Sequence, residues 1–263
     1  ANSMTARMNT AQKQKQFWEK MEEKYPLPFE EKNLTRTQEV IALAEQRGVK
    51  IDGASILDVG CGTGVYTLPL AQRAAHVTGL DLSEAMVRRF EEERQKNGIE
   101  NATVIQMPWS DAAVSEHTLE KAFDIVWAAM TPALRSPEDV ARMNRCARDW
   151  CVYIGWGGMR KNPFLAEVFQ AHDQTFGPPP GAKAVHAHLA AMGIDTEIEF
   201  FRSHWEWEGT EDEAVSHAEG FLRALTEAEP NLDLIREIAA RFSTDGTVTH
   251  RTEVEKGFMT WQA

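Results

Sequence analysis

The residues best suited to chemistry lie in a glycine-rich stretch, "ILDVGCGTG", at Ile56–Gly64. An apolar strand candidate leads into glycines spaced two apart, and Asp58 stands just before them. Glycine allows the backbone to approach a ligand where no side chain would fit. A carboxylate at the end of the strand suits a positively charged ligand group, held by charge-assisted hydrogen bonds. The stretch therefore predicts a turn around a ligand that carries a cation.

Two phosphate-binding interpretations fit this spacing poorly. A P-loop needs G-x-x-x-x-G-K-[ST], and neither Lys-Ser nor Lys-Thr follows here. The dinucleotide fingerprint needs a third glycine three positions after the second, and counting from Gly60 and Gly62 that position is Val65. An acid at the strand end is also a poor neighbour for a pyrophosphate. A nicotinamide-linked dehydrogenase remains an alternative, disfavoured by the glycine spacing.

A second acid, Asp81, ends the next strand candidate, 17 residues beyond Gly64. At this place an α/β nucleotide site holds a carboxylate that accepts hydrogen bonds from the ribose hydroxyls. A nucleoside with an amino-acid-like tail and no phosphate points to S-adenosylmethionine (SAM).

With these motifs the chain resembles the class I, seven-strand, SAM-dependent methyltransferases of the small-molecule type. "ILDVGCGTG" matches the first motif of that family, and "VTGLDLSEAMV" at Val77–Val87 matches the second. "ATVIQMPWSDA" and "FDIVWAAM" stand where the third and fourth motifs belong. The resemblance covers about Ser55–Trp156 and implies SAM as methyl donor, with S-adenosylhomocysteine as product.

The resemblance also implies roles for individual residues. Asp58 would face the methionyl amino group, Asp81 would hold the ribose hydroxyls and Leu82 would flank the adenine. Trp109 would stack on the adenine or cover the mouth of the pocket, and Tyr25 is either a cover for the SAM site or a core aromatic. The remaining cofactor-binding candidates belong to the four motifs: Gly60, Cys61, Gly62, Gly64, Met86, Met107, Pro108 and Ala128. Cys61 is interpreted as a small packing residue rather than a nucleophile.

In the third motif the family usually offers a small residue and an acid near the adenine. Met107-Pro108-Trp109-Ser110 stands there instead, and Asp111 is the nearest replacement for the acid.

Strand and helix patterns alternate through the middle of the chain. Strands are expected at Ser55–Val59, His76–Asp81, Ala102–Met107, Phe123–Ala129 and Cys151–Trp156. Helices are expected between them at Tyr66–Arg73, Glu84–Asn97, Asp111–Glu120 and Glu138–Trp150. Repeated strand–helix–strand units predict a parallel sheet with right-handed crossovers. The fold class is therefore α/β and Rossmann-like: a doubly wound, mostly parallel seven-stranded sheet with helices on both faces and an antiparallel last strand.

The two ends of the chain lack the regular alternation of strands and helices that the middle shows. Residues 1–53 predict an N-terminal helical cap, with a helix around Phe17–Tyr25 and a second capped by Asn33. Ala1–Ser3, ahead of Met4, has the character of an expression scar. Residues 54–263 would form the SAM-binding core, with a helical insertion at about 208–245.

In the C-terminal third a helix is expected at Asn162–Phe176 and a strand at Thr196–Trp207. Thr210–Glu213 would open a further helix as a capping box. Trp205 and Trp207 share one face of the expected strand, as core residues or as a wall of the substrate pocket.

The composition of the chain limits the kinds of partner that we expect the protein to bind. The formal net charge is −12, which argues against a broad nucleic-acid surface. There is no apolar run long enough to span a membrane and no apolar signal segment, so a cytoplasmic location is expected. His186 and His188, two apart on an expected helix, face different sides, so no metal is expected. No catalytic base is assigned; His172, His204 and Tyr25 are the candidates.

Motifs that the chain lacks narrow the range of methyl acceptors that we expect. Family members that methylate adenine or glutamine amino groups carry Asn/Asp-Pro-Pro-Tyr after the fourth strand, where this chain has "AAMTP" at Ala128–Pro132. Enzymes that attack pyrimidine C5 carry a cysteine nucleophile there. The expected activity is methyl transfer to a small molecule. A protein or RNA methyltransferase and a non-catalytic SAM-binding protein are the alternatives.

Overall fold

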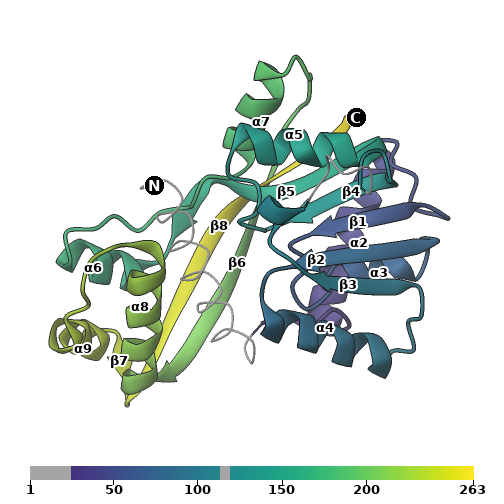
Figure 1. Ribbon diagram of the computed structural model, residues 1–263. Helices are drawn as coiled ribbons and strands as arrows, with labels where there is room; N and C mark the ends of the chain where they lie inside the picture. Colours follow the sequence, from purple (N-terminus) through teal and green to yellow (C-terminus); the bar gives the residue numbers. More distant parts are fainter. Residues whose placement is uncertain (1–24, 113–118) are drawn as a thin grey trace. The chain divides into compact units, whose positions relative to one another are not determined.

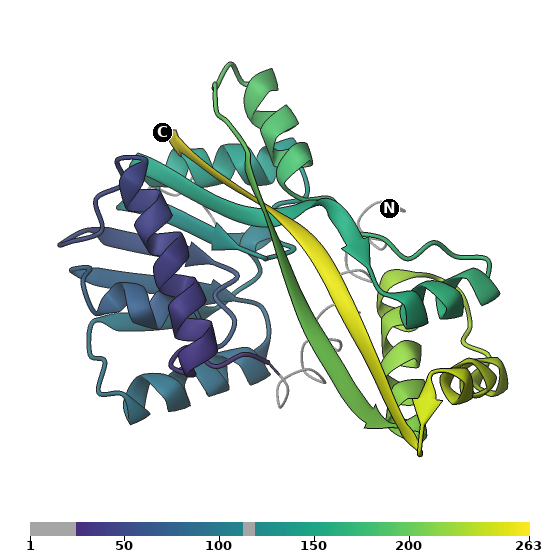
Figure 2. The same cartoon turned by 180° about the vertical axis from the view of Figure 1, so that it is seen from behind.

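A computed structural model describes residues 25–112 and 119–263, drawn from opposite sides in Figures 1 and 2. The chain divides into two compact units. The glycine-loop unit comprises described residues within Trp18–Gly155, together with Ala182–Glu199 and Phe258–Ala263. The C-terminal unit comprises Trp156–Gly181 and Phe200–Gly257 among the described residues. Each unit has a buried apolar cluster of its own.

A twisted sheet runs through the fold in the order β3-β2-β1-β4-β5-β8-β6. Its first five strands are β1 (Ser55–Val59), β2 (His76–Asp81), β3 (Ala102–Gln106), β4 (Phe123–Ala129) and β5 (Ala147–Lys161). All pairings among these five are parallel. The chain order reverses between β1 and β4, and ligands of doubly wound sheets bind beyond the carboxyl ends of the strands at such a point. The glycine loop follows β1 at this position.

The late strands complete the expected sheet. They are β6 (Glu199–Thr210) and β8 (Thr247–Gln262), and β8 runs antiparallel to its neighbours, as predicted. A short strand, β7 (Ser243–Thr244), pairs with β8 and lies off the main order.

Helices cover both faces of the sheet in the glycine-loop unit. These helices are α2 (Glu31–Gln46), α3 (Thr67–Ala71), α4 (Glu84–Lys96), α5 (Pro137–Cys146) and α7 (Ala182–Ala191). Helices α2 and α3 lie on one face and α5 and α7 on the other. A capping box opens α5, because the Ser136 side chain accepts from the Asp139 N–H while the Asp139 side chain accepts from the Ser136 N–H.

The C-terminal unit packs three helices around an apolar cluster. They are α6 (Pro163–Ala171), α8 (Glu211–Leu225) and α9 (Leu232–Arg241). Their buried side chains include Phe164, Phe169, Leu222 and Ile238. The Thr210–Glu213 capping box opens α8 as predicted.

Several predicted boundaries are wrong for identifiable reasons. Helix α2 begins at Glu31, so Asn33 lies inside its first turn and does not cap it. The side-chain amide of Asn33 instead donates to the Glu30 carboxylate at 2.6 Å. Helix α5 ends at Cys146 rather than Trp150, because the strand β5 begins at Ala147 and pairs with β4 there. Tertiary pairing overrides the helical pattern in that segment.

Strand β5 is also longer than expected. The predicted strand ends at Trp156, yet β5 continues through Gly157 and Gly158 to Lys161. Strand β6 begins at Glu199 rather than Thr196, and α6 ends at Ala171 rather than Phe176.

The helix expected at Asp111–Glu120 is replaced at its start by a 3₁₀ turn at Trp109–Asp111. Residues 113–118, which would carry its middle, lie outside the described residues. So does the expected helix around Phe17, apart from Tyr25. Across the part of the chain that is described, no helix is both long and apolar enough to traverse a bilayer.

Candidate active site at the glycine loop

The turn after β1 is built from glycines in a conformation that other residues avoid. The φ angles of Gly60, Gly62 and Gly64 are +73°, +55° and +88°. The N–H groups of Gly60 and Cys61 both donate to the Leu80 carbonyl of β2, at 2.7 and 3.0 Å. The left-handed conformation and this double bond fold the backbone tightly over the end of the sheet.

Gly60 has a second reason to lack a side chain. A Cβ placed on Gly60 would lie 2.0 Å from Oγ1 of Thr131, a residue that follows β4. Real Cβ atoms do not come so close to a neighbour. The loops after β1 and after β4 therefore contact each other through Gly60 and Thr131, across the point where the strand order reverses.

We expect Gly60→Ala to destabilise the protein by about 2–4 kcal/mol, because it adds a clash to backbone strain. The matched control is Gly53→Ala: Gly53 also has positive φ (+72°), but a Cβ there meets nothing within 4 Å. That control should lose only about 1 kcal/mol, the cost of the conformation alone. Urea unfolding measures both. Equal losses in the two variants would show that Thr131 does not constrain the loop.

Asp81 ties the glycine loop to the start of α4. Its carboxylate accepts from the Gly62 N–H and from the Ser83 N–H, both at 2.9 Å. Burial raises the pKa of Asp81, and the backbone N–H bonds oppose that shift. Asp81 thus lies at the end of β2, where the sequence predicts it, and holds the turn that we expect to contact the same ligand.

Asp58 is a buried carboxyl group with one hydroxyl partner. Its side chain is 2% exposed and accepts from Oγ1 of Thr67 at 2.5 Å. Burial, with the charge of Asp81 adding to it, raises the pKa of Asp58 to about 7, although the Thr67 bond lowers it. Neither Asp58 nor Asp81 has an ion-pair partner among the described residues. The two acids form a negative site that a cation would stabilise.

Two tyrosines, Tyr25 and Tyr66, lie close enough to the carboxylates of this site for the negative charge to affect their pKa values. A Cβ on Gly62 would be 3.2 Å from Cε1 of Tyr25, which places that ring against the glycine turn. Burial and the nearby carboxylates raise the pKa of Tyr25, and burial with Asp58 raises that of Tyr66. Tyr66 also contacts the ring of Trp127, which pairs in register with Asp58. Tyr25 therefore lies at the predicted site, and its role as a cover for SAM stays a prediction.

Cys61 faces the sheet. A Cβ on Gly79 of β2 would lie 2.6 Å from Cys61 Sγ, so the thiol fills the space that this glycine leaves open. Burial raises the pKa of the thiol well above its usual value. A neutral, packed thiol of this kind is a poor nucleophile.

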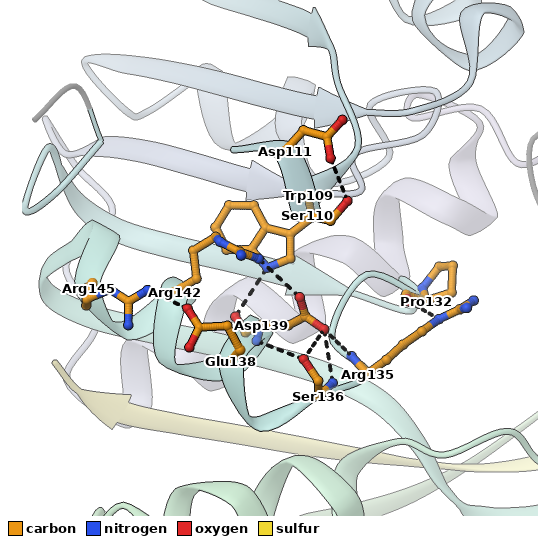
Figure 3. A network of polar contacts seen from close by, with 10 residues as sticks. All are labelled: Trp109, Ser110, Asp111, Pro132, Arg135, Ser136, Glu138, Asp139, Arg142 and Arg145. Atoms are coloured by element: carbon orange, nitrogen blue, oxygen red, sulfur yellow. Dashed lines mark hydrogen bonds and ion pairs between the residues drawn. The ribbon is translucent and has the colours of Figure 1, made fainter. Parts of the chain in front are cut away.

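The third motif is held against the start of α5, as Figure 3 shows. Trp109 is 5% exposed, and its indole N–H donates to the Asp139 carbonyl at 3.2 Å. The Arg142 guanidinium lies over the same ring, 5.5 Å from its centroid, and bonds to the Asp139 carboxylate. These contacts fix Trp109 in the core beside the half-buried Met107 and Pro108. Whether the free part of the ring meets an adenine stays a prediction.

The remaining predicted residues surround the carboxyl ends of β2 and β4. Met86 is buried in the first turn of α4, where its N–H donates to the capping hydroxyl of Ser83 at 3.4 Å. Leu82, half-buried, lies between Asp81 and that cap. Ala128 is fully buried near the end of β4. Met130, two residues on, has a left-handed φ of +52°, the kind of strained backbone that clusters at functional sites.

Sequence reasoning missed the polar partners of the two acids. Ser83 and Thr131 follow β2 and β4 closely, whereas Thr67 begins α3 after the glycine turn, and each of the three touches the glycine loop or one of the two carboxylates. The available signal for Ser83 and Thr131 was their position as small hydroxyl residues just beyond the carboxyl ends of β2 and β4.

The histidine candidates have structural partners or lie exposed. His172 Nδ1 donates to the Val168 carbonyl at 2.7 Å, and its Nε2 accepts from the Asn231 N–H at 2.9 Å. His186 bonds to the Thr196 carbonyl at 3.0 Å. His204 is exposed. Within residues 25–112 and 119–263, no group of three metal-ligating side chains converges.

The geometry fits SAM better than a phosphate ligand. The buried Asp58 and the half-buried Asp81 supply negative charge at a turn where no side chain occupies the glycine positions. The charge would favour the methionyl ammonium and sulfonium, and Asp81 could accept from ribose hydroxyls. When bound, SAM supplies an electrophilic methyl group.

Comparison with known proteins agrees. The family described as "Methyltransferase domain" matches residues 56–152. A 23S rRNA uracil-C5 methyltransferase of Hahella chejuensis is 33% identical over 135 residues, which are 49% of this chain and 30% of that protein. The chain thus spans less than a third of that curated relative.

Solved structures share the fold at low identity. A protein described as a methyltransferase of Bacillus halodurans is 15% identical with a TM-score of 0.55, over 86% of this chain and 98% of that one. One described as a sarcosine dimethylglycine methyltransferase of Galdieria sulphuraria is 14% identical with a TM-score of 0.53, over 87% of this chain and 85% of that one. Likeness at this level shows the fold alone.

The sheet order and the glycine turn define the class I, Rossmann-like methyltransferase fold. Within that class, residues 56–152 form a SAM-dependent methyltransferase domain.

Proposed function

We propose that this protein transfers a methyl group from SAM to a small molecule. The observation that supports SAM as the donor is a pair of acids, the buried Asp58 and the half-buried Asp81, on either side of a turn that leaves room for backbone approach. The domain match to methyltransferases supports the same donor. The acceptor half rests on the chemistry of the residues around the donor site.

Uracil-C5 methylation, the activity named for the Hahella relative, is disfavoured by the cysteines. Pyrimidine C5 chemistry needs a thiolate that attacks the ring. The chain has three cysteines, all of them buried, at Cys61, Cys146 and Cys151. Burial raises the pKa of each. Residues Ala128–Pro132, after β4, include none of them.

Charge also favours a small acceptor. The chain carries 40 acidic and 28 basic residues. Many arginines are used in ion pairs, such as Arg73 with Glu45 and Asp52. A long RNA surface would need clustered, unpaired cations to contact phosphates. RNA methylation is nevertheless the second candidate, because the Hahella relative acts on 23S rRNA by its name.

Thermal shift with four adenosine-containing ligands tests the identity of the methyl donor. We expect SAM and S-adenosylhomocysteine to raise the unfolding temperature, and NAD and ATP to leave it unchanged, because only ligands that bind the folded state stabilise it. At a SAM concentration 100 times Kd, the stabilisation is about 2.7 kcal/mol. Stabilisation by NAD but not by SAM would overturn the donor assignment.

Transfer of label tests the acceptor. The protein is incubated with methyl-labelled SAM and either a small-molecule extract or purified ribosomal RNA, with Asp81→Ala as the inactive control. Label in the small-molecule fraction supports the proposal. Label in RNA would replace it with the second candidate. SAM binding without transfer in either fraction would indicate a binding protein without turnover.

A further inference from the structure

A buried arginine lies among aromatic rings in the C-terminal unit. Arg160 of β5 is 9% exposed. Its guanidinium carbon is 4.5 Å from the ring centroid of Phe176, 5.0 Å from that of Phe221 and 5.1 Å from that of Trp156. Three rings thus surround one cation, and all of these residues belong to the same unit.

Arg160 has no counter-ion within residues 25–112 and 119–263. Among the described residues its guanidinium makes neither an ion pair nor a hydrogen bond, and its Nε is buried without a partner. Burial alone lowers the pKa of Arg160 to about 10. Ring faces attract a cation, but they do not satisfy the N–H groups in the guanidinium plane. A buried charge in this condition is costly unless an anion completes it.

A second buried N–H group without a hydrogen-bond partner among the described residues belongs to His250, in the same unit as Arg160. The side-chain oxygen Oδ1 of Asn162 accepts from the Leu165 N–H at 2.9 Å, so the side-chain nitrogen Nδ2 faces His250 Nδ1 at 2.8 Å. That nitrogen donates, which makes Nδ1 the acceptor and leaves the proton on Nε2. His250 Nε2 is buried with no partner among the described residues. Burial lowers the pKa of His250 to about 4, which keeps the ring neutral with one free N–H.

Aromatic contacts connect the two donors. Phe221, beside Arg160, meets the His217 ring at 5.0 Å. His217 stacks on Trp207 at 4.9 Å, and Trp207 stacks on His250 at 4.9 Å with planes 9° apart. Arg160 and His250 are therefore two ends of one aromatic cluster, drawn from β5, β6, α8 and β8. The cluster offers N–H donors and ring surface, and no carboxylate shifts the pKa of either donor.

We propose that this cluster binds a small aromatic carboxylate. The carboxylate would pair with Arg160, whose planar fork matches its two oxygens. The aromatic body would rest against the half-buried rings of Trp156, Phe176 and Phe221. One negative charge neutralises one guanidinium, whereas a phosphate dianion would leave excess charge in a buried place. The inference is independent of methyl transfer, since it concerns binding within the C-terminal unit.

Titration with benzoate tests the site on the full chain, read by tryptophan fluorescence and by thermal unfolding. Benzoate should quench fluorescence, because Trp156 contacts Arg160, and should raise the unfolding temperature. Benzamide has the same ring without the charge and should bind at least tenfold more weakly. Inorganic phosphate serves as the anion without a ring and should also bind more weakly than benzoate.

Arg160→Met should weaken benzoate binding at least tenfold, since it keeps apolar volume and removes the cation. Arg251→Met is the matched control: Arg251 is exposed on β8, next to His250, and pairs with Glu253 at 3.4 Å. It should bind benzoate as the unmodified protein does. Arg160→Lys keeps the charge but replaces the planar fork with a point charge, so it provides a second variant if Arg160→Met fails to fold, and it should weaken benzoate binding several-fold.

Three results would overturn the site: no response to benzoate in the unmodified protein, equal affinity for benzamide, or unchanged affinity in a folded Arg160→Met variant. Tighter binding of phosphate than of benzoate would overturn the ligand class. SAM binding is measured on the same samples, so a failed donor assignment is distinguished from a failed carboxylate site.

Discussion

Asp81→Ala should weaken SAM binding at least tenfold. The substitution removes the expected acceptor for the ribose hydroxyls, and hydrogen bonds to a charged group contribute about 1.5–3 kcal/mol. It also leaves the N–H groups of Gly62 and Ser83 without the carboxylate that holds them at 2.9 Å. The glycine turn would then lose its bond to the start of α4, and binding would have to order it again.

Calorimetric titration with SAM measures this effect. Asp52→Ala is the control, because Asp52 is an exposed carboxylate that precedes β1, at the opposite end from the glycine loop, and bonds to Arg73 at 2.7 Å. It should bind SAM normally. Asp81→Asn keeps one acceptor oxygen and should fall between the two. Unchanged affinity in Asp81→Ala would mean that the second motif does not contact the ribose.

Asp58→Asn should have opposite effects on stability and on binding. A folded-state pKa raised to about 7, against 3.8 for a free carboxyl, means that folding favours the protonated group. The stability it contributes is therefore present below about pH 4 and is lost as pH rises through about 7. Asparagine mimics the protonated form, so the variant should be more stable than the unmodified protein at pH 8, by about 1–2 kcal/mol after the weaker Thr67 bond is counted.

The same variant should bind SAM at least tenfold more weakly, because the methionyl ammonium loses its charged partner. Urea unfolding at pH 5 and pH 8, with titration of SAM at pH 7.5, separates the two effects. The gain in stability should shrink at pH 5. Asp52→Asn, at an exposed carboxylate, should show no such gain at pH 8. A stabilised variant with full SAM affinity would remove Asp58 from the ammonium site.

The parts of this protein that sequence predicts well are those with local signals. Strands β1, β2 and β4 match their predicted bounds because each is a short, buried, apolar run with a clear end. Helices α5 and α8 begin where their capping boxes stand. The two acids and the glycine turn were predictable because their spacing along the chain reflects one geometry, the carboxyl ends of adjacent parallel strands.

Features that join distant segments were not predictable in this way. Thr67 bonds to Asp58 after the glycine turn reverses the chain, and nothing in the type of Thr67 marks that role. The rings around Arg160 come from residues as far along the chain as Phe221, which is 61 positions away and whose ring centroid lies 5.0 Å from the guanidinium carbon. Strand β5 continues through three glycines because its neighbours in the sheet supply the bonds that local propensity does not.

The contact of Gly60 with Thr131 has a consequence for how this domain can diverge. The hydroxyl of Thr131 occupies the volume in which the Cβ of a larger residue at position 60 would lie. The two positions therefore cannot both carry a side chain that extends into this space. Across related chains, residues 60 and 131 should covary: alanine at 60 is compatible only with glycine or alanine at 131, and a hydroxyl at 131 requires glycine at 60. Because residue 60 follows β1 and residue 131 follows β4, the covariation would couple the sequence of the glycine loop to that of the loop after β4, and a substitution at residue 131 would determine which residues the glycine turn can accept.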